Sequence, residues 1–216
     1  MAPYPRPTHL WRCVVSTLAL LLPVLLHAQE SANVHFLWAF EALISEGSVT
    51  KQLPVREDTT LKTGDLLKLY VELRQPCFVY IIHHGAGGEL RWLFPYDVQQ
   101  FGTDYHLSKV YEIPQHDAWF RINEQAGHET FYLFASAQRL TDIETRLGAY
   151  AIAPPSEQAQ AATQVVSDLR ALIKQHRTAI KPGRPVPIAG NMRQGVEALE
   201  ISATDFYSKT VTIEHR

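Results

Sequence analysis

The stretch from Leu61 to Pro95 constrains the fold more than any other part of the chain. Between Leu67 and Arg74, apolar and polar residues alternate strictly, a pattern typical of a β-strand with one buried face and one face in water. After a turn at Gln75–Pro76, the continuous apolar run Cys77–Ile82 predicts a central strand that is covered on both faces. Together these patterns predict an antiparallel sheet.

The end of this second strand carries two histidines and a glycine cluster, which we interpret as a turn. Adjacent strand residues point to opposite faces, so His83 and His84 cannot readily bind one metal ion. A phosphate-binding loop opens onto a helix N-terminus, whereas Gly85–Gly88 leads into Leu90–Phe94, which predicts another strand. We therefore expect a β-hairpin here.

The first 28 residues have the pattern of a secretory signal peptide. Arg6 and Arg12 precede an apolar segment from Val14 to Leu26, and a plausible cleavage site ends at Ala28. The apolar segment is short against the roughly 20 residues of a membrane-spanning helix. The sequence therefore predicts an exported protein, periplasmic or extracellular, with no stable membrane span once this segment is removed; an uncleaved anchor is the alternative.

Cleavage would remove Cys13 and leave Cys77 as the single cysteine, which excludes an intramolecular disulfide. Reactive thiols need an exposed, electropositive setting. Because Cys77 opens an apolar run, we expect it to be a small buried apolar residue and not a nucleophile.

Further strands are predicted on both sides of the central stretch. The run Val34–Ile44 is rich in aromatic and branched residues and predicts a mostly buried strand, with a helix as the alternative. Ser45–Thr60 reads as a connection with room for a short edge strand. Later strands are expected at Val110–Ile113, Trp119–Ile122, Thr130–Ser136, Val196–Ile201 and Lys209–Glu214.

Helices are predicted between Ser136 and the last strands. Thr141–Glu144 has the form of a capping box for a short helix that ends at Gly148. Ser156–Arg177 has helical spacing with an apolar stripe, which we expect to pack on the sheet; a helix that recruits a partner is the alternative. Lys181–Pro187 contains three prolines and predicts an extended connection without regular structure.

Residues 29–216 are therefore predicted to form one mainly β domain. We expect an antiparallel β-sandwich, Ig-like in general architecture, with one or two helices inserted before the final strands. Its parts are a core at 61–136, a helical excursion at 141–180 and C-terminal strands at 196–215.

The order of several short motifs resembles a known family. A Gly64–Asp65 turn, the strand Phe78–Ile82, a glycine-rich turn ending in Gly88–Glu89 and the triplet Leu93–Phe94–Pro95 follow one another. In this order and spacing they resemble the bacterial exported domain of unknown function 4384 family, over Leu61–Ser136. The resemblance implies an all-β module, usually exported or attached to other domains, with no agreed activity and no established catalytic residues.

The segment Tyr96–His116 is the sequence's best candidate for a binding surface. The resemblance implies that it is a variable loop, and loops on a rigid scaffold often carry binding residues. The candidate residues are Tyr96, Asp97, Asp104, Tyr105 and His106. A plain solvated loop is the alternative. The predicted partner is another protein of the cell envelope.

Charge and motifs disfavour several classes of function. The formal charge of −2 gives no basic excess for nucleic acid. The sequence contains no G-x-S-x-G elbow, H-E-x-x-H helix, paired C-x-x-C or Walker loop. We therefore expect a non-catalytic interaction or assembly module of the bacterial cell envelope without metal or cofactor. The alternative is an envelope hydrolase of unrecognised type that uses loop carboxylates and histidines, with these candidates: Asp97, Asp104, Asp117, Glu129, His106, His116 and His128.

Overall fold

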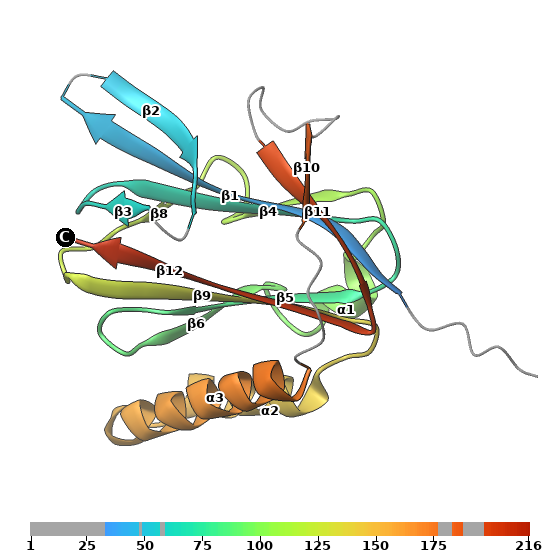
Figure 1. The fold of residues 1–216 in the computed structure, drawn as a ribbon. Coiled ribbons are helices and arrows are strands. Elements are labelled where there is room, and N and C mark those ends of the chain that lie inside the picture. The colour runs from blue at the N-terminus through green and yellow to red at the C-terminus, as the bar shows by residue number, and fades with distance from the viewer. Residues whose placement is uncertain (1–32, 48, 57–58, 177–182, 188–196) are drawn as a thin grey trace, which may run out of the picture. The chain divides into compact units, whose positions relative to one another are not determined.

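The computed structural model describes residues 33–47, 49–56, 59–176, 183–187 and 197–216. These residues form two β-sheets that pack face to face, and two helices cover the outer face of one sheet (Figure 1). The predicted mainly β sandwich with inserted helices is confirmed. The signal segment predicted at 1–28 lies outside the described residues.

The first sheet has seven strands in the described part of the chain. Five follow one another in the order β10 (Arg184–Pro187), β11 (Glu197–Thr204), β1 (Asn33–Glu46), β4 (Leu66–Leu73) and β7 (Val110–Ile113). Strand β2 (Val49–Pro54) pairs with the second half of β1, and β8 (Phe120–Arg121) pairs with the start of β4. All these pairs are antiparallel. The strand predicted at 34–44 is thus confirmed as β1, and the connection after it holds β2.

The second sheet has five described strands, ordered β3 (Thr60–Leu61), β12 (Phe206–His215), β9 (Gly127–Ser136), β5 (Phe78–His84) and β6 (Leu90–Phe94). Only the short β3–β12 pair is parallel. Consecutive strands β11 and β12 join different sheets through a turn at Asp205, which has a positive φ of 61°. The last two strands therefore complete both sheets of the same sandwich.

The main hydrophobic core lies between the two sheets. Alternate residues of β1 and β4 point inward and meet alternate residues of β5, β9 and β12, as a period of two requires. Phe40 and Phe131 pack edge to face across the interface, with ring centroids 4.7 Å apart. The fully buried members include Val34, Phe36, Ala42, Val71, Val79, Ala135 and Ile213.

The Gly64–Asp65 turn and the Leu93–Phe94–Pro95 triplet both make contacts that stabilise this sandwich. Gly64 adopts a positive φ of 93°, which favours glycine. The buried Asp65 carboxylate accepts hydrogen bonds from the Lys62 amide at 2.8 Å and the Ser45 amide at 3.4 Å. Phe94 is fully buried, and its ring contacts the rings of Tyr96, Tyr105 and Tyr111. Both motifs are accordingly structural.

Helices α2 (Thr141–Ile152) and α3 (Pro155–Gln175) pack on the outer face of the five-stranded sheet. The apolar stripe of α3 is buried there, as predicted: Leu169 is fully buried and Val165 nearly so. The third helix, α1 (Gln100–Thr103), is a single turn after β6. The alternative of a free, partner-recruiting stripe is wrong.

The predicted capping box at Thr141–Glu144 is also wrong. Leu140 is the N-cap residue, and no side chain caps this helix. The buried Glu144 carboxylate instead accepts a hydrogen bond from the Tyr80 hydroxyl at 2.7 Å and pairs with Arg139. The helix continues past Gly148 to Ile152.

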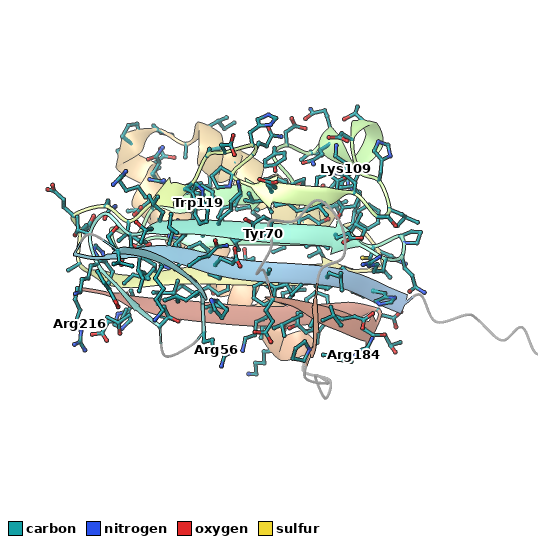
Figure 2. All side chains as sticks on the ribbon, turned by 90° about the horizontal axis from the view of Figure 1, so that it is seen from above. Arg56, Tyr70, Lys109, Trp119, Arg184 and Arg216 are labelled. Carbon is teal, nitrogen blue, oxygen red and sulfur yellow. The ribbon has the colours of Figure 1, made fainter. Side chains whose placement is uncertain are left out.

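One face of strand β4, which the alternating pattern predicts to lie in water, is buried in the structure. Lys68, Tyr70 and Glu72 were expected in water but are only 1%, 2% and 4% exposed. The Lys68 ammonium pairs with Glu112 at 2.6 Å and lies over the Trp119 ring. Tyr70 packs in a small cluster in the middle of this face (Figure 2). Tertiary partners therefore cover a face that the local pattern assigns to solvent.

The proline-rich segment was predicted to lack regular structure, but its described part forms strand β10. Pro185 and Pro187 are opposite Leu199 and Glu197 of β11. Proline is tolerated in an edge strand, where one side needs no amide donor, and β10 ends the strand order of its sheet. Lys181 and Pro182 lie outside the described residues.

Candidate functional site

The two tyrosines predicted as binding residues are packed against the scaffold. The Tyr105 hydroxyl accepts a hydrogen bond from the Val79 amide at 2.8 Å, and burial raises its pKa well above the ordinary value. The Tyr96 hydroxyl donates to the Glu112 carbonyl, and burial raises its pKa as well. Both side chains fix the 96–116 segment to the sheets.

The three polar candidates of this segment lie nearer the surface. Asp97 is exposed, and its carboxylate accepts a hydrogen bond from the Gln100 amide at 2.9 Å. Asp104 pairs with Lys109 at 2.5 Å, and His106 lies 3.7 Å from the same carboxylate. The structure thus brings Asp104 and His106 together but leaves Asp97 with a local role at α1.

The hydrolase candidates are spread over several segments. His116 and Asp117 follow β7, while His128 and Glu129 lie on β9. The Glu129 carboxylate is buried and accepts a hydrogen bond from the His83 ring at 2.5 Å. Burial acts to raise the pKa of Glu129, but the contacts with His83, the Ala86 backbone and His215 together outweigh it, and the net pKa is lowered. Within the described ranges, no group of three or more histidine, cysteine, aspartate or glutamate residues forms a set that could hold a metal ion.

His83 and His84 lie on opposite faces of β5, as predicted. The His83 ring packs on Phe131 in the inner core, at a centroid distance of 4.7 Å. His84 faces the helices and lines a half-open cleft with a volume of 680 Å³. A volume of this size suits a small ligand or a short peptide segment, since such sites span roughly 300–1,000 Å³. This cleft is our candidate functional site.

One wall of the cleft is the β5–β6 turn, confirmed as a hairpin. The Gly85 amide bonds the Glu89 carbonyl at 2.9 Å, and Gly88 has a positive φ of 85°. The Glu89 carboxylate folds back over the turn, where a Cβ at Gly85 would displace it and a Cβ at Gly87 would meet it together with the Gln125 side chain. The glycine cluster therefore makes room for Glu89.

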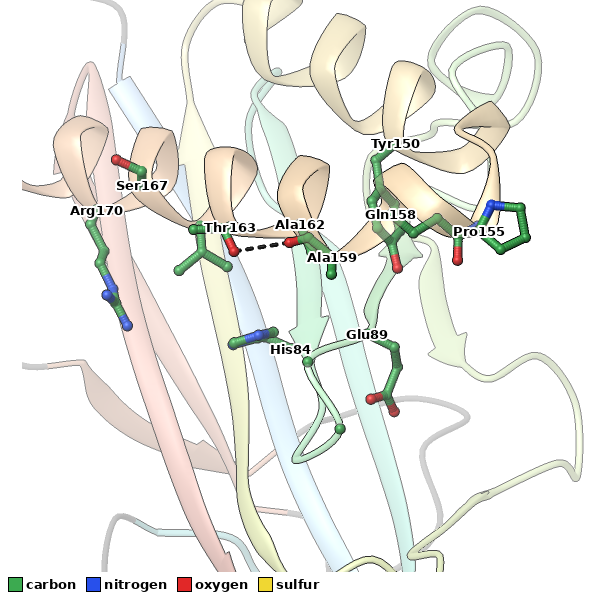
Figure 3. A pocket seen from close by; sticks show the side chains of 13 residues that line it. His84, Glu89, Tyr150, Pro155, Gln158, Ala159, Ala162, Thr163, Ser167 and Arg170 are labelled. Carbon is green, nitrogen blue, oxygen red and sulfur yellow. Dashed lines mark hydrogen bonds between the residues drawn. The ribbon is translucent and has the colours of Figure 1, made fainter.

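The other wall is one face of α3. Its lining residues recur every three or four positions, the spacing of a single helix face, and Tyr150 of α2 closes one side (Figure 3). The Tyr150 hydroxyl accepts a hydrogen bond from the Leu90 amide at 3.0 Å, which ties the β5–β6 hairpin to α2. Small side chains keep the cleft open, and the wall consists of Pro155, Gln158, Ala159, Ala162, Thr163, Val166, Ser167 and Arg170.

Two polar side chains of the cleft, the half-buried His84 and the exposed Arg170, make no polar contact with the rest of the described protein. Neither the His84 imidazole nor the Arg170 guanidinium has a hydrogen-bond or ion-pair partner among the described residues. Burial, His83 and Arg170 lower the pKa of His84, while Glu89 acts in the opposite direction. Glu89 has a loose ion pair with Arg91 at 3.9 Å. The cleft thus presents a neutral imidazole between a cation and an anion at neutral pH.

Sequence reasoning considered His84 and the glycines but missed the cleft. The missing signal lies on α3, where Ala159, Ala162 and Ser167 place small side chains at helical spacing beside the core stripe. The two walls lie about seventy positions apart in the chain, and only the fold brings them together.

Comparison with known families agrees with this description of the scaffold. Residues 60–139 match the model of a family described as a domain of unknown function (DUF4384). This part of the chain is similar to that family. The DUF4384 match covers strands β3 to β9, the turn wall of the cleft included, and stops before α2 and α3. No curated protein and no solved structure matches the chain.

None of the described helices, α3 with its 21 residues included, is long and apolar enough to cross a membrane.

Proposed function

We propose that this protein is an exported, non-catalytic binding module of the cell envelope, and that the cleft between α3 and the β5–β6 turn is its binding site. Export rests on the leader pattern of residues 1–28, with a periplasmic or extracellular destination. The DUF4384 match leaves the activity open, so the argument for binding rests on the cleft.

The observation that carries the proposal is that two polar side chains without a protein partner among the described residues, the half-buried His84 and the exposed Arg170, meet at one cavity. Arg170 and His84 come from different elements, line the same 680 Å³ cleft and lack protein partners in the described part of the chain. Polar groups withdrawn from water in proteins are normally hydrogen-bonded, and the half-buried His84 ring is such a group. A bound ligand would supply a partner for His84 and would replace water at Arg170.

The hydroxyl groups of the cleft favour binding over nucleophilic chemistry. A nucleophile needs a base within hydrogen-bond reach. The Thr163 hydroxyl donates to the Ala159 carbonyl of its own helix at 2.9 Å, and the described contacts of Ser167 include no bond to His84. Neither hydroxyl therefore has the arrangement of an activated nucleophile.

The proposal is tested by filling the cleft without touching the core. Ala159 is exposed on the α3 wall, so Ala159→Trp blocks the cavity, whereas Gln160→Trp adds the same bulk at the next position, outside the lining. The full chain and both variants are used to capture components from an envelope extract. We expect Ala159→Trp to lose the captured component and Gln160→Trp to retain it.

The segment 96–116, which the sequence predicts as a binding surface, is the alternative location of the binding site. The double variant Asp104→Ala, His106→Ala removes its surface charges without touching the packed tyrosines. If this variant loses the component while Ala159→Trp keeps it, the site belongs to the 96–116 segment and the cleft assignment fails. Capture that is unchanged in every variant also refutes the cleft as the binding site.

A further inference from the structure

We infer that the cleft recognises a short peptide with two free ends, holding its carboxylate at Arg170 and its amine at Glu89. This inference rests on the proposed function and specifies the class of ligand. It follows from the order of charged groups along the cleft and from the apolar surface between them.

The charges of the cleft are separated along its length. Figure 3 shows Arg170 at one end, Glu89 at the other and His84 between them, all bordering the space beneath α3. Arg170 and Glu89 shift the pKa of His84 in opposite directions, so both act on the same central group. A ligand with a single charge would contact one end of this arrangement and leave the other with its present surroundings, the loose Arg91 pair for Glu89 or solvent for Arg170.

Each end has the chemistry of a specific group. A guanidinium presents paired donors that match the two oxygens of a carboxylate. The Glu89 carboxylate can only accept hydrogen bonds when it is ionised, and an ammonium can only donate. Its loose contact with Arg91, at 3.9 Å, leaves capacity for such a donor.

The middle of the cleft favours a short aliphatic backbone over a bulky sugar or ring. Ala159, Ala162 and Val166 provide a small apolar strip on α3. His84 in its neutral form has one donor and one acceptor, which matches the N–H and C=O of a peptide unit. The cavity thus offers partners, in order, for an amine, a peptide unit and a carboxylate.

Three peptides that differ only at their ends test the inference on the full chain. Trialanine carries both charges, trialaninamide lacks the carboxylate, and N-acetyl-trialanine lacks the amine. Binding is measured by titration calorimetry at pH 7. We expect each blocked peptide to bind roughly tenfold more weakly than trialanine, because each loses one charge-assisted contact, worth ~1.4 kcal/mol for a tenfold change.

Two variants assign each end to its residue. Arg170→Ala should bind trialanine and trialaninamide equally, and Glu89→Gln should bind trialanine and N-acetyl-trialanine equally. Lys174→Ala, which removes a positive charge from α3 outside the cleft lining, should keep the full discrimination. Thermal unfolding of each variant verifies that the fold is retained.

Several results would overturn the inference. The inference fails if trialanine does not bind, or if the unmodified chain binds all three peptides equally. It also fails if Arg170→Ala and Glu89→Gln both still prefer trialanine to the two blocked peptides. The proposed function stands if trialanine fails to bind while Ala159→Trp still abolishes capture from the envelope extract. The proposed function is refuted, and the inferred class of ligand is kept, if trialanine binds as described but Ala159→Trp does not change the capture from the envelope extract.

Discussion

The hydroxyl of Tyr80 joins the second sheet to helix α2, and its removal gives the sharpest test of the packing described above. Tyr80 is fully buried on β5. Its hydroxyl donates to the Glu144 carboxylate at 2.7 Å and accepts from the Leu140 amide at 2.9 Å. The substitution Tyr80→Phe keeps the ring and deletes both hydrogen bonds.

The loss of stability in Tyr80→Phe depends on which hydrogen bonds Glu144 and the Leu140 amide keep. Glu144 is 6% exposed but keeps its Arg139 contact, so its loss is one hydrogen bond to a charged group, about 1.5–3 kcal/mol. The half-buried Leu140 amide loses its acceptor and adds a smaller amount. We expect the free energy of unfolding to fall by about 2–4 kcal/mol, which corresponds to a fall in Tm of about 5–15 °C for a domain of this size.

Urea unfolding measures this change, with Tyr132→Phe as the matched control. Tyr132 is 3% exposed on the same face of the sheet, and its hydroxyl has no hydrogen bond among the described contacts. That variant should therefore change the free energy of unfolding by less than about 0.5 kcal/mol. The slope of free energy against urea should be the same in all three proteins. Equal losses in the two variants would refute the assigned role of the Tyr80 hydroxyl.

Two further predictions concern titratable groups. Cys77 is 3% exposed, and burial raises the pKa of its thiol to about 11. Iodoacetamide at pH 8 should therefore leave Cys77 unmodified in the native protein and alkylate it in urea, as measured by peptide mass spectrometry. Alkylation of the native protein would contradict the burial of the thiol. Because the pKa of Glu129 is lowered in the fold, its stabilising contribution is complete above the ordinary glutamate pKa and is lost as pH falls through the folded value. Glu129→Gln should therefore be less stable than the unmodified chain at pH 7, and the difference between their urea midpoints should close toward pH 3. The substitution of the exposed Glu124, Glu124→Gln, should change the midpoint at neither pH. A difference for Glu129→Gln that is constant with pH would exclude the stabilising contact between the ionised Glu129 carboxylate and His83.

Local patterns predicted most of the scaffold because most strands bury one face against the same core. The alternation in Leu67–Leu73 and the apolar run before His83 are properties of single segments, and both became strands. The errors arose where a distant residue decides the outcome. Glu144 leaves its expected capping role because Tyr80, sixty-four positions away, binds its carboxylate. Lys68 is buried because Glu112 and Trp119 cover it.

The candidate site was less accessible to sequence reasoning for a related reason. Polar and aromatic residues at 96–116 suggested a binding surface, but Tyr105 is an internal support of β5. Composition alone does not distinguish an aromatic residue that binds a ligand from one that packs on its own sheet. In the cleft, by contrast, the informative residues on α3 are small, and they matter only because the β5–β6 turn lies opposite them.

The two walls of the cleft also differ in their relation to the DUF4384 scaffold. Within the matched residues 60–139, the Gly64–Asp65 turn and Phe94 are used for internal contacts, and only the turn from His84 to Glu89 reaches the cleft. The remaining lining residues, Tyr150 and the face of α3, follow the matched part. A binding site assembled in this way takes His84 and Glu89 from the matched residues, and Arg170 with the small apolar side chains from the helix that follows them. Substitutions on the exposed side of α3 should therefore alter ligand preference while the sandwich, whose core lies on the far side of the second sheet, keeps its stability.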